Sequence, residues 1–338
     1  MQVLQNFSLR KYNSFAIDVL AEYFSTFSSV TELEEILMVL ADKYRSPLIL
    51  GGGSNILFTG DIRGLVLKNE FSGMEVVGEE ADYVFMKAGA GENWHQFVLH
   101  CISKNLAGAE NLSLIPGNVG AAPMQNIGAY GVELKDIFHE LEAFHLKDKQ
   151  IIKFGLKDCS FGYRESVFKT RFKNQFVILN VTFKLLKKPV YNTSYGAIEL
   201  ELKKMGVKEL SIQAISEAVI NIRRSKLPDP AKIGNAGSFF KNPEIPSSLF
   251  VELKKLFPDI VGYALENGNT KLAAGWLIEQ CGWKGYRDGD AGCHEKQALV
   301  LVNYGNASGK EIFDLSEKIL QSVKEKFGVV LEREVNII

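Results

Sequence analysis

The sequence predicts an α+β fold, in which helices are combined with antiparallel sheet, and it predicts two or three domains. The chain has 338 residues, and a domain typically holds about 150 residues. Four stretches have apolar residues at the period of an amphipathic helix. Residues 176–185 instead alternate apolar and polar side chains, the pattern of a strand with one buried face. We therefore expect a mixed fold with antiparallel sheet near residues 176–185.

The composition excludes several classes of protein. Lys and Arg number 39 against 40 Asp and Glu, a net charge of −1 with both signs spread along the chain, whereas nucleic-acid and anionic-membrane proteins carry a basic surplus or stripe. A hydrophobic content of 46% is ordinary for a globular protein. No apolar run reaches the roughly 18 residues of a membrane span, and the first residues lack the pattern of a secretion signal. We expect a cytoplasmic protein without nucleic-acid or membrane partners.

The cysteines and histidines do not predict a metal site. The four cysteines form no Cys-x-x-Cys pair and are expected to be reduced thiols: Cys101, Cys159, Cys281 and Cys293. The five histidines have no spacing that assembles a zinc site, and we interpret all of them as structural: His95, His100, His139, His145 and His294.

The predicted elements follow in order along the chain. Residues 31–45 predict a helix that begins with a capping box of Thr31 and Glu34, and residues 47–50 predict a short apolar strand. Residues 94–102 predict a second amphipathic helix. A third helix is predicted over 211–224, where it is stopped by the segment that begins Leu227-Pro228. Four of the nine prolines lie between Pro228 and Pro246, which makes this segment the best candidate for a domain boundary.

The C-terminal part predicts one more helix and a strand. Ser308 and Glu311 form a capping box for a helix that continues to Phe327. A strand is predicted over 329–338, and its period of two puts Glu332 and Glu334 on one face. Periodicity does not choose between these two glutamates, and a solvated strand edge would explain both.

Three loops are rich in glycine and other small residues. They lie at 51–58, 89–91 and 115–123. Glycine lets backbone N–H groups approach phosphate oxygens, although one such loop alone is as well explained by a structural turn. The fingerprint of a Rossmann dehydrogenase needs a third glycine, and Ile56 and Trp94 stand at that position in the first two loops. The three loops together favour a nucleotide cofactor and disfavour a Rossmann fold.

Eight motifs carry a specific resemblance to a known family. In chain order they are Gly-Gly-Gly-Ser-Asn-Ile-Leu at 51–57, Gly-Ala-Gly-Glu-Asn-Trp at 89–94, Ile-Pro-Gly-Asn-Val-Gly at 115–120, Gln-Asn-Ile-Gly-Ala-Tyr-Gly at 125–131, Phe-Gly-Tyr-Arg-Glu-Ser at 161–166, Lys-Leu-Pro-Asp-Pro at 226–230, Asn-Ala-Gly-Ser-Phe-Phe-Lys-Asn-Pro at 235–243 and Lys-Leu-Ala-Ala-Gly-Trp-Leu-Ile at 271–278. Together they resemble the UDP-N-acetylenolpyruvoylglucosamine reductases (MurB). These are flavoenzymes that reduce an enolpyruvyl ether of UDP-N-acetylglucosamine to UDP-N-acetylmuramate, with NADPH as co-substrate and FAD as cofactor.

The resemblance implies a fold and a cofactor. The fold is a two-part FAD-binding region of the vanillyl-alcohol-oxidase type plus a third, α/β domain that binds the substrate. We expect the two FAD-binding parts at 1–72, joined by the C-terminal strand 328–338, and at 73–227, and the substrate-binding domain at 228–327. The FAD is expected to be non-covalent, because the first loop has neither His nor Cys. The implied cofactor-binding residues are Gly51, Gly53, Ser54, Asn55, Gly117, Gly120, Asn126 and Gly128.

The resemblance also implies three catalytic residues. Hydride addition to the enol ether builds an enolate beside a carboxylate, so a cation and an acid are needed there. Arg164 matches the family arginine that stabilises the enolate, and Ser238 matches the serine that protonates it. Glu334 matches the second acid, so the resemblance makes the choice that periodicity does not. Arg333 stands where many members have proline.

For the UDP sugar, the resemblance implies a further set of residues. They are Tyr130, Tyr195, Arg223, Lys226, Asn242, Tyr263 and Gln297, with Tyr263 in a loop at 258–270 that closes over substrate in the longer type of member. We expect a monomer. Two alternatives remain open: an FAD-dependent oxidase of another small alcohol or sugar, and a non-catalytic module that binds a nucleotide.

Overall fold

The computed structural model describes residues 2–40 and 47–338, and the contacts within it divide the chain into two units. Unit 1 contains the residues up to Phe7 and the segments Ala21–Gly53 and Ile62–Ser225. Unit 2 contains Ser8–Leu20, Ser54–Asp61 and Lys226–Ile338. Each unit is thus built from stretches that are far apart in the sequence.

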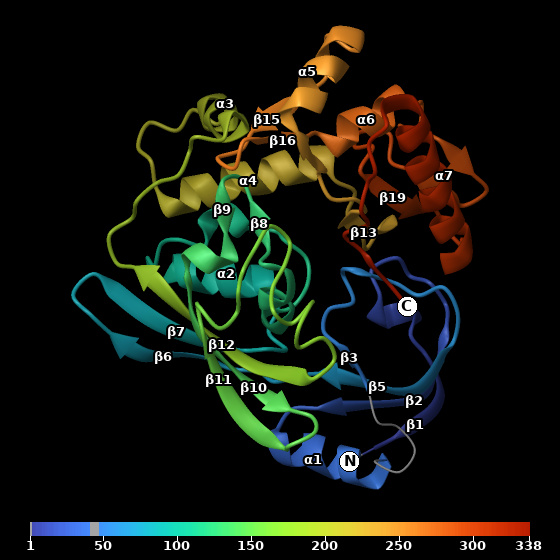
Figure 1. Ribbon diagram of the computed structural model, residues 1–338. Coiled ribbons are helices and arrows are strands. Elements are labelled where there is room, and N and C mark those ends of the chain that lie inside the picture. Colours follow the sequence, from blue (N-terminus) through green and yellow to red (C-terminus); the bar gives the residue numbers. More distant parts are fainter. Residues whose placement is uncertain (1, 41–46) are drawn as a thin grey trace. The chain divides into compact units, whose positions relative to one another are not determined.

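The first sheet of unit 1 has four strands in the order β1-β2-β5-β3. Strand β5 is parallel to both β2 and β3, and helix α1 packs on the same core through Leu33 and Ile36, which are fully buried with Leu67. Figure 1 shows these elements in blue. Their bounds are β1 Leu4–Ser8, β2 Leu20–Phe27, α1 Val30–Leu40, β3 Leu48–Leu50 and β5 Ile62–Asn69.

The second sheet of unit 1 has five antiparallel strands in the order β11-β10-β12-β7-β6. Helix α2 covers one face, and the five apolar residues that predicted this helix are all buried. The remaining helices α3 and α4 of unit 1 share a small apolar core of their own. The bounds are β6 Met74–Glu79, β7 Tyr83–Gly89, α2 Trp94–Ser103, β8 Gly128–Ala129, β9 Val132–Glu133, β10 Phe138–His145, β11 Gln150–Gly155, β12 Phe176–Leu186, α3 Gly196–Lys204 and α4 Ile212–Lys226.

Strand β12 occupies the centre of this sheet and is buried on both faces, not on one face as its alternation predicts. Val177 and Leu179 pack in the core with α1, whereas Val181 and Phe183 pack in the core with α2. The register of the pairing with β10 shifts at Leu179: Ile178 and Asn180 pair with two consecutive residues of β10, and Leu179 between them has no partner there. A bulge of this kind reverses the side to which the following residues point, because side chains alternate along a strand.

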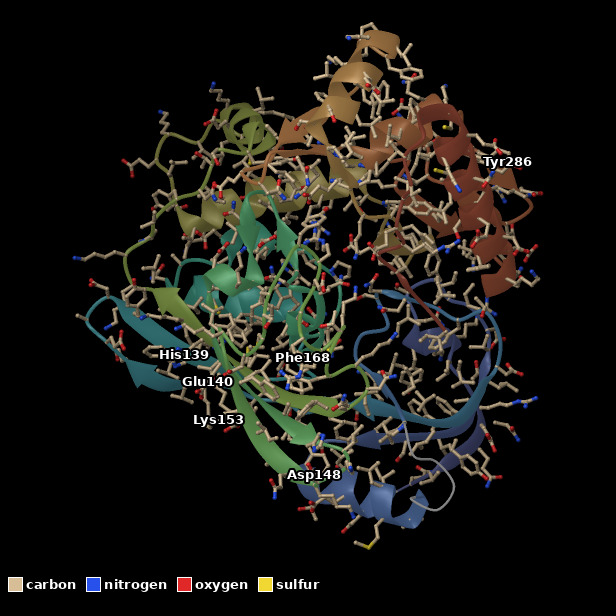
Figure 2. All side chains as sticks on the ribbon, in the orientation of Figure 1. His139, Glu140, Asp148, Lys153, Phe168 and Tyr286 are labelled. Atoms are coloured by element: carbon tan, nitrogen blue, oxygen red, sulfur yellow. The ribbon has the colours of Figure 1, made fainter. Side chains whose placement is uncertain are left out.

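The face of the sheet opposite α2 carries paired charges. Lys87 Nζ lies 3.0 Å from a carboxylate oxygen of Glu142, and Lys153 Nζ lies 3.2 Å from one of Glu140. Figure 2 shows Glu140 and Lys153 close together on neighbouring strands. Such pairs, which are exposed or partly exposed to solvent, contribute little stability, and they indicate a solvated face.

Unit 2 contains a four-stranded sheet in the order β13-β19-β18-β17, a three-stranded sheet in the order β14-β16-β15, and the parallel pair β20-β4. Figure 1 shows the C-terminal strand ending beside the blue segment that contains β4. The bounds are β4 Ile56–Leu57, β13 Gly234–Ser238, β14 Glu244–Pro246, α5 Ser247–Leu256, β15 Gly262–Ala264, β16 Asn269–Leu272, α6 Ala274–Gln280, β17 Arg287–Asp288, β18 Ala291–Cys293, β19 Val300–Asn303, α7 Gly309–Phe327 and β20 Asn336–Ile337.

Most of the predicted helices are confirmed. Helix α7 begins at the predicted capping box of Ser308 and Glu311 and ends at Gly328, whose φ of 67° closes the helix with a left-handed residue. Helix α4 begins after Ser211, whose Oγ accepts the N–H of Ala214 at 3.1 Å. Within the described ranges, none of the helices combines the length and the apolar character that crossing a membrane requires.

Two predicted details are wrong. The first helix is capped by Ser29, whose Oγ accepts the N–H of Glu32, and not by Thr31 and Glu34; the predicted continuation over 41–46 lies outside the described residues. The predicted strand over 329–338 is a strand only at Asn336–Ile337, because its earlier part finds a single bridge partner, from Phe240 to Arg333. The three-part division at 1–72, 73–227 and 228–327 stays a prediction.

Replacing Ser29 by alanine should lower the free energy of unfolding by about 1 kcal/mol, because the N–H of Glu32 loses its acceptor at the start of α1. Replacing Thr31, an exposed residue inside the helix, should change it by less than about 0.5 kcal/mol. Urea denaturation followed by circular dichroism measures both variants. A larger loss for Thr31→Ala would support the capping box that the sequence suggests.

Candidate functional site

Three glycine loops of unit 1 meet one another, and we call them the glycine cluster. The first follows β3, the second leads from β7 into α2, and the third precedes the turn that carries Tyr130. The cluster comprises Gly51–Gly53, Gly89–Gly91 and Gly117–Gly120.

The glycine cluster is packed backbone against backbone. A Cβ atom on Gly52 would lie 2.9 Å from the Cα of Gly117, and one on Gly120 would lie 2.5 Å from the Cβ of Ala90. The N–H of Gly120 also donates to the carbonyl of Ala90 at 2.9 Å, and the N–H of Trp94 donates to that of Gly117 at 3.0 Å. Side chains at these positions would separate the loops, so Gly52 and Gly120 are required by packing.

The first loop presents unused hydrogen-bond donors. Among the described residues, none accepts a hydrogen bond from the N–H of Gly51, Gly52 or Gly53. A Cβ on Gly51 would meet nothing nearer than 3.8 Å, and Gly53 has a φ of 61°. Consecutive free amides without side chains over them form a concavity that attracts anions. These residues therefore fit the pyrophosphate of a dinucleotide such as FAD.

Two tyrosines and two arginines that the sequence predicts as site residues lie together in unit 1, and we call them the arginine–tyrosine cluster. The rings of Tyr130 and Tyr195 meet edge to face with centroids 5.3 Å apart. Arg164 donates from Nη2 to the carbonyl of Gly128 at 2.8 Å, two residues before Tyr130. Arg223 lies on α4, and both Tyr130 and Arg164 are close enough to act on it electrostatically.

The charge of Arg223 decides which ligand the arginine–tyrosine cluster favours. Burial lowers the pKa of Arg223, and the nearby charge of Arg164 adds to this effect, while Tyr130 opposes it. Burial raises the pKa of Tyr130, which Arg223 partly offsets. Among the described residues, no carboxylate forms an ion pair with Arg223, and its one hydrogen bond runs from Nε to the carbonyl of Leu114. Because a charge that is partly withdrawn from water is costly unless it is paired, the half-buried Arg223 favours an anionic ligand.

Asn126, a predicted cofactor residue, has a fully buried side chain that is already engaged. Its Nδ2 donates to Glu133 at 3.1 Å and to the carbonyl of Gly162 at 3.0 Å, while its Oδ1 accepts the N–H of Lys135. Its φ of 44° lies in the left-handed region. Asn126 thus fixes the turn that leads to Gly128, and its contact with a cofactor stays a prediction.

Ser238 is the last residue of β13 in unit 2, and its position is set by its neighbours. Asn235 holds the preceding turn, because its Oδ1 accepts the N–H of Gly237 at 3.0 Å, and Gly237 has a φ of 71°. The following residue, Phe239, is fully buried against Phe15. The backbone of Ser238 is therefore fixed on both sides, by the turn at Gly237 and by the buried ring of Phe239.

The backbone joins Glu334 to the Ser238 segment. The N–H of Glu334 donates to the carbonyl of Phe239 at 2.8 Å, and Asn55 Nδ2 donates to the carbonyl of Glu334 at 3.2 Å. Glu332 instead pairs with Lys241 and has an exposed side chain. The structure therefore distinguishes the two glutamates that periodicity leaves equivalent, and it gives Asn55 a role in holding the Glu334 segment.

Of the other predicted residues of unit 2, two lie together at the start of α6 and two are exposed. Asn242 and Gln297 converge on the first turn of α6: Asn242 Oδ1 accepts the N–H of Ala274 at 3.0 Å, and Gln297 Oε1 lies 3.1 Å from the Cβ position of Gly275. Lys226, at the end of α4, is exposed. Tyr263 lies on β15 and is 58% exposed.

Two functional candidates were missed by reasoning from the sequence. Asn111, which is 1% exposed, donates both Nδ2 hydrogens, to the carbonyls of Tyr130 and Asn192, each at 2.9 Å. Asn235 positions Ser238 as described above. Asn111 has no local signal, because the carbonyls that accept from it lie 19 and 81 residues away. Asn235 has one, because an asparagine two residues before a glycine can accept the N–H of that glycine in a tight turn. Within residues 2–40 and 47–338, no group of three or more His, Cys, Asp or Glu side chains is placed to hold a metal ion.

Comparison with protein families identifies both parts of the chain. Residues 229–338 match the model of the UDP-N-acetylenolpyruvoylglucosamine reductase C-terminal domain, and residues 21–155 match the model of an FAD binding domain. The computed fold resembles the crystal structure of UDP-N-acetylenolpyruvylglucosamine reductase (MurB) from Thermus caldophilus, with a TM-score of 0.68 and 24% identity over 99% of this chain and 98% of that one. The predicted α+β fold with an FAD-binding region is confirmed.

Full-length relatives are also found. The reductase of Pseudomonas savastanoi pv. phaseolicola is 49% identical over 100% of this chain and 99% of its own length. The reductases of Flavobacterium johnsoniae and Amoebophilus asiaticus are each 49% identical over 100% of both chains. With identity of this order along the whole chain, and with both family models matched in sequence, the chain belongs to the UDP-N-acetylenolpyruvoylglucosamine reductase family.

Proposed function

We propose that this protein reduces the enolpyruvyl ether of UDP-N-acetylglucosamine to UDP-N-acetylmuramate in the synthesis of peptidoglycan precursors, with NADPH as the source of electrons. The observation that carries the proposal is the positive charge of Arg223, which no carboxylate of the described residues pairs. A diphosphate and an enolpyruvyl carboxylate supply the anionic groups that Arg223 lacks within the described protein. Bound FAD supplies the hydride that is added to the enol ether.

The proposed catalytic residues follow from the charge that the reaction develops. Arg164 offers a planar set of N–H donors to the carboxylate and to the enolate oxygen, the geometry that guanidinium groups match best. Ser238 gives its proton to the enolate carbon. Glu334, whose backbone is bonded to that of Phe239, completes the acid pair. A serine is a weak acid in water, so its surroundings must lower the cost of the alkoxide.

The proposed binding residues divide between the cofactor and the UDP sugar. The free amides of Gly51 and Gly53 would hold the FAD pyrophosphate, and no histidine or cysteine stands in that loop for a covalent bond. Tyr130, Tyr195 and Arg223 would contact the substrate from unit 1. The remaining four substrate residues belong to unit 2: Lys226, Asn242, Tyr263 and Gln297.

The compartment and the oligomeric state belong to the same proposal. UDP sugars and NADPH are cytoplasmic metabolites, which supports the cytoplasmic location expected from the sequence. A monomer is proposed, and sedimentation velocity would measure its mass against the 37.6 kDa of one chain.

One cuvette experiment tests the proposed activity. The purified protein should absorb in the visible range as a flavoprotein, lose that absorbance on anaerobic addition of NADPH, and regain it on addition of the enolpyruvyl UDP sugar. Rapid recovery with oxygen and no response to the UDP sugar would favour the FAD-dependent oxidase. Binding of the UDP sugar without any recovery would favour the non-catalytic module.

Replacing Ser238 by alanine should separate the two half-reactions. Flavin reduction by NADPH should keep its rate, because no substrate carbon is protonated in that step. Reoxidation by the UDP sugar should slow by about 10²-fold to 10⁴-fold, the usual contribution of a general acid. Stopped-flow absorbance measures both rates, and Ser248→Ala, on an exposed position of α5, is the matched control. An unchanged reoxidation rate would remove Ser238 as the proton donor.

The glycine cluster gives a second prediction through a matched pair of variants. Gly51→Ala should leave the melting temperature unchanged and raise the Kd for FAD about tenfold or more, because its methyl group meets only ordinary contacts in the protein and takes up space in the loop proposed to hold the pyrophosphate. Gly120→Ala should lower the melting temperature, because its Cβ would lie 2.5 Å from that of Ala90. Differential scanning calorimetry and flavin fluorescence measure the two effects. Normal FAD affinity in Gly51→Ala would argue against the proposed pyrophosphate site.

A further inference from the structure

The backbone of Leu114 is held from both sides by side chains of two helices. Its N–H donates to Nδ1 of His95 at 3.0 Å, and its carbonyl accepts Nε of Arg223 at 3.1 Å. His95 is the second residue of α2, and Arg223 lies on α4. The single peptide segment at Leu114 therefore connects a histidine of one helix to the arginine of another.

Leu114 adopts a conformation that its residue type does not favour. Its φ of 58° lies in the left-handed region, where a Cβ atom is close to the backbone carbonyl. Non-glycine residues keep such a conformation only where their surroundings impose it. The neighbouring Ser113 is also fixed, because its Oγ lies 2.8 Å from that of Ser216 on α4 and both residues are buried. The carbonyl of Leu114 is thus directed at Arg223 by a constrained backbone.

His95 must be unprotonated at Nδ1 to accept the N–H of Leu114. Burial lowers the pKa of His95, and the positive charges of Arg224 and Arg223 on α4 lower it further. These arginines are the charged groups that act on the imidazole. Both effects favour the neutral ring, which is the form that the hydrogen bond needs.

We infer that His95 is a positioning residue for Arg223 and acts through the backbone of Leu114. The histidine holds the N–H of Leu114, the carbonyl of Leu114 holds Nε of Arg223, and the terminal nitrogens of Arg223 are left to receive an anionic ligand. This inference rests on the proposed role of Arg223 in binding the UDP sugar. It assigns a specific task to a histidine that its sequence context marks only as structural.

Two substitutions of His95 distinguish the loss of its hydrogen bond to Leu114 from the loss of its side-chain volume. In His95→Asn, the side-chain oxygen takes nearly the place of Nδ1 and can accept the same N–H, whereas His95→Leu leaves that N–H without an acceptor. His95→Leu should raise the KM for the enolpyruvyl UDP sugar at least tenfold while kcat stays within about twofold, the signature of lost uniform binding. His95→Asn should stay within about threefold of the wild-type KM. His100→Leu, the same exchange on the same helix without a contact to Leu114, is the control and should match the wild type.

A double-mutant cycle tests whether the effect passes through Arg223. If it does, adding His95→Leu to Arg223→Ala should raise the KM no further, because the arginine to be positioned is gone. Additive effects, or an equal loss in His95→Asn and His95→Leu, would overturn the inference. A wild-type enzyme that fails to turn over the UDP sugar would instead count against the proposed function, so the two failures are distinguishable.

A pH profile keeps the test decisive if His95→Leu does not fold. Protonation of His95 replaces the acceptor at Nδ1 by a donor, so the KM of the wild type should rise as the pH falls through the pKa of His95, which lies below the usual 6.5. His95→Asn cannot be protonated in this range and should show no such rise. Identical acid limbs in the two proteins would contradict the inference.

Discussion

The close contact between the glycine loops is the constraint on which the rest of unit 1 depends. Because Gly52 approaches the Cα of Gly117 and Gly120 approaches Ala90, the three loops are fixed relative to one another by their backbones. The third loop in turn receives the first N–H of α2 and leads into the turn of Tyr130. The glycines therefore have two separate roles. Gly52 and Gly120 allow the loops to pack closely, and Gly51 and Gly53 leave their backbone amides available to an anion.

Buried asparagines continue this backbone framework into the site. Asn126 holds its own left-handed turn, Asn111 holds the carbonyl of Tyr130, which has a φ of 50°, and Asn235 holds the left-handed Gly237 before Ser238. A carboxamide has both hydrogen-bond donors and an acceptor, so one side chain can form hydrogen bonds with two backbone segments at once. Such side chains fix left-handed turns, and they do so next to residues that are proposed to bind the substrate or to react.

The sequence predicts best those features that are decided locally. Helices α2, α4 and α7 are predicted from the spacing of apolar residues and from caps within a few residues. Strand β12 is predicted from its run of β-branched and aromatic residues. The sequence does not decide the cap of α1, because Ser29 with Glu32 and Thr31 with Glu34 offer the same pattern two residues apart. The sequence predicts too long a strand over 329–338, because the pairing of this segment depends on Phe240 and Ile56, which are distant in the chain.

The candidate site divides in the same way. Motifs identify the residues proposed to touch substrate or cofactor, such as Arg164 and Ser238. They do not reveal Asn111 or His95, whose hydrogen bonds run to the backbone of other segments. Nor does the spacing reveal that Glu332 pairs with Lys241 while Glu334 is joined to Phe239. Long-range partners decide these roles, and a single sequence carries no direct record of them.

The pairing of β20 with β4 gives unit 2 a particular order of assembly on the ribosome. Asn55 and Glu334 are 279 residues apart in the chain, yet one holds the other's carbonyl. At about 5–20 residues per second, the ribosome needs roughly 15–55 s to make that stretch. The segment after the first glycine loop therefore emerges long before its partner and waits unpaired while unit 1 is synthesised. Completion of unit 2 is thus timed by the last part of translation, however early its first residues appear.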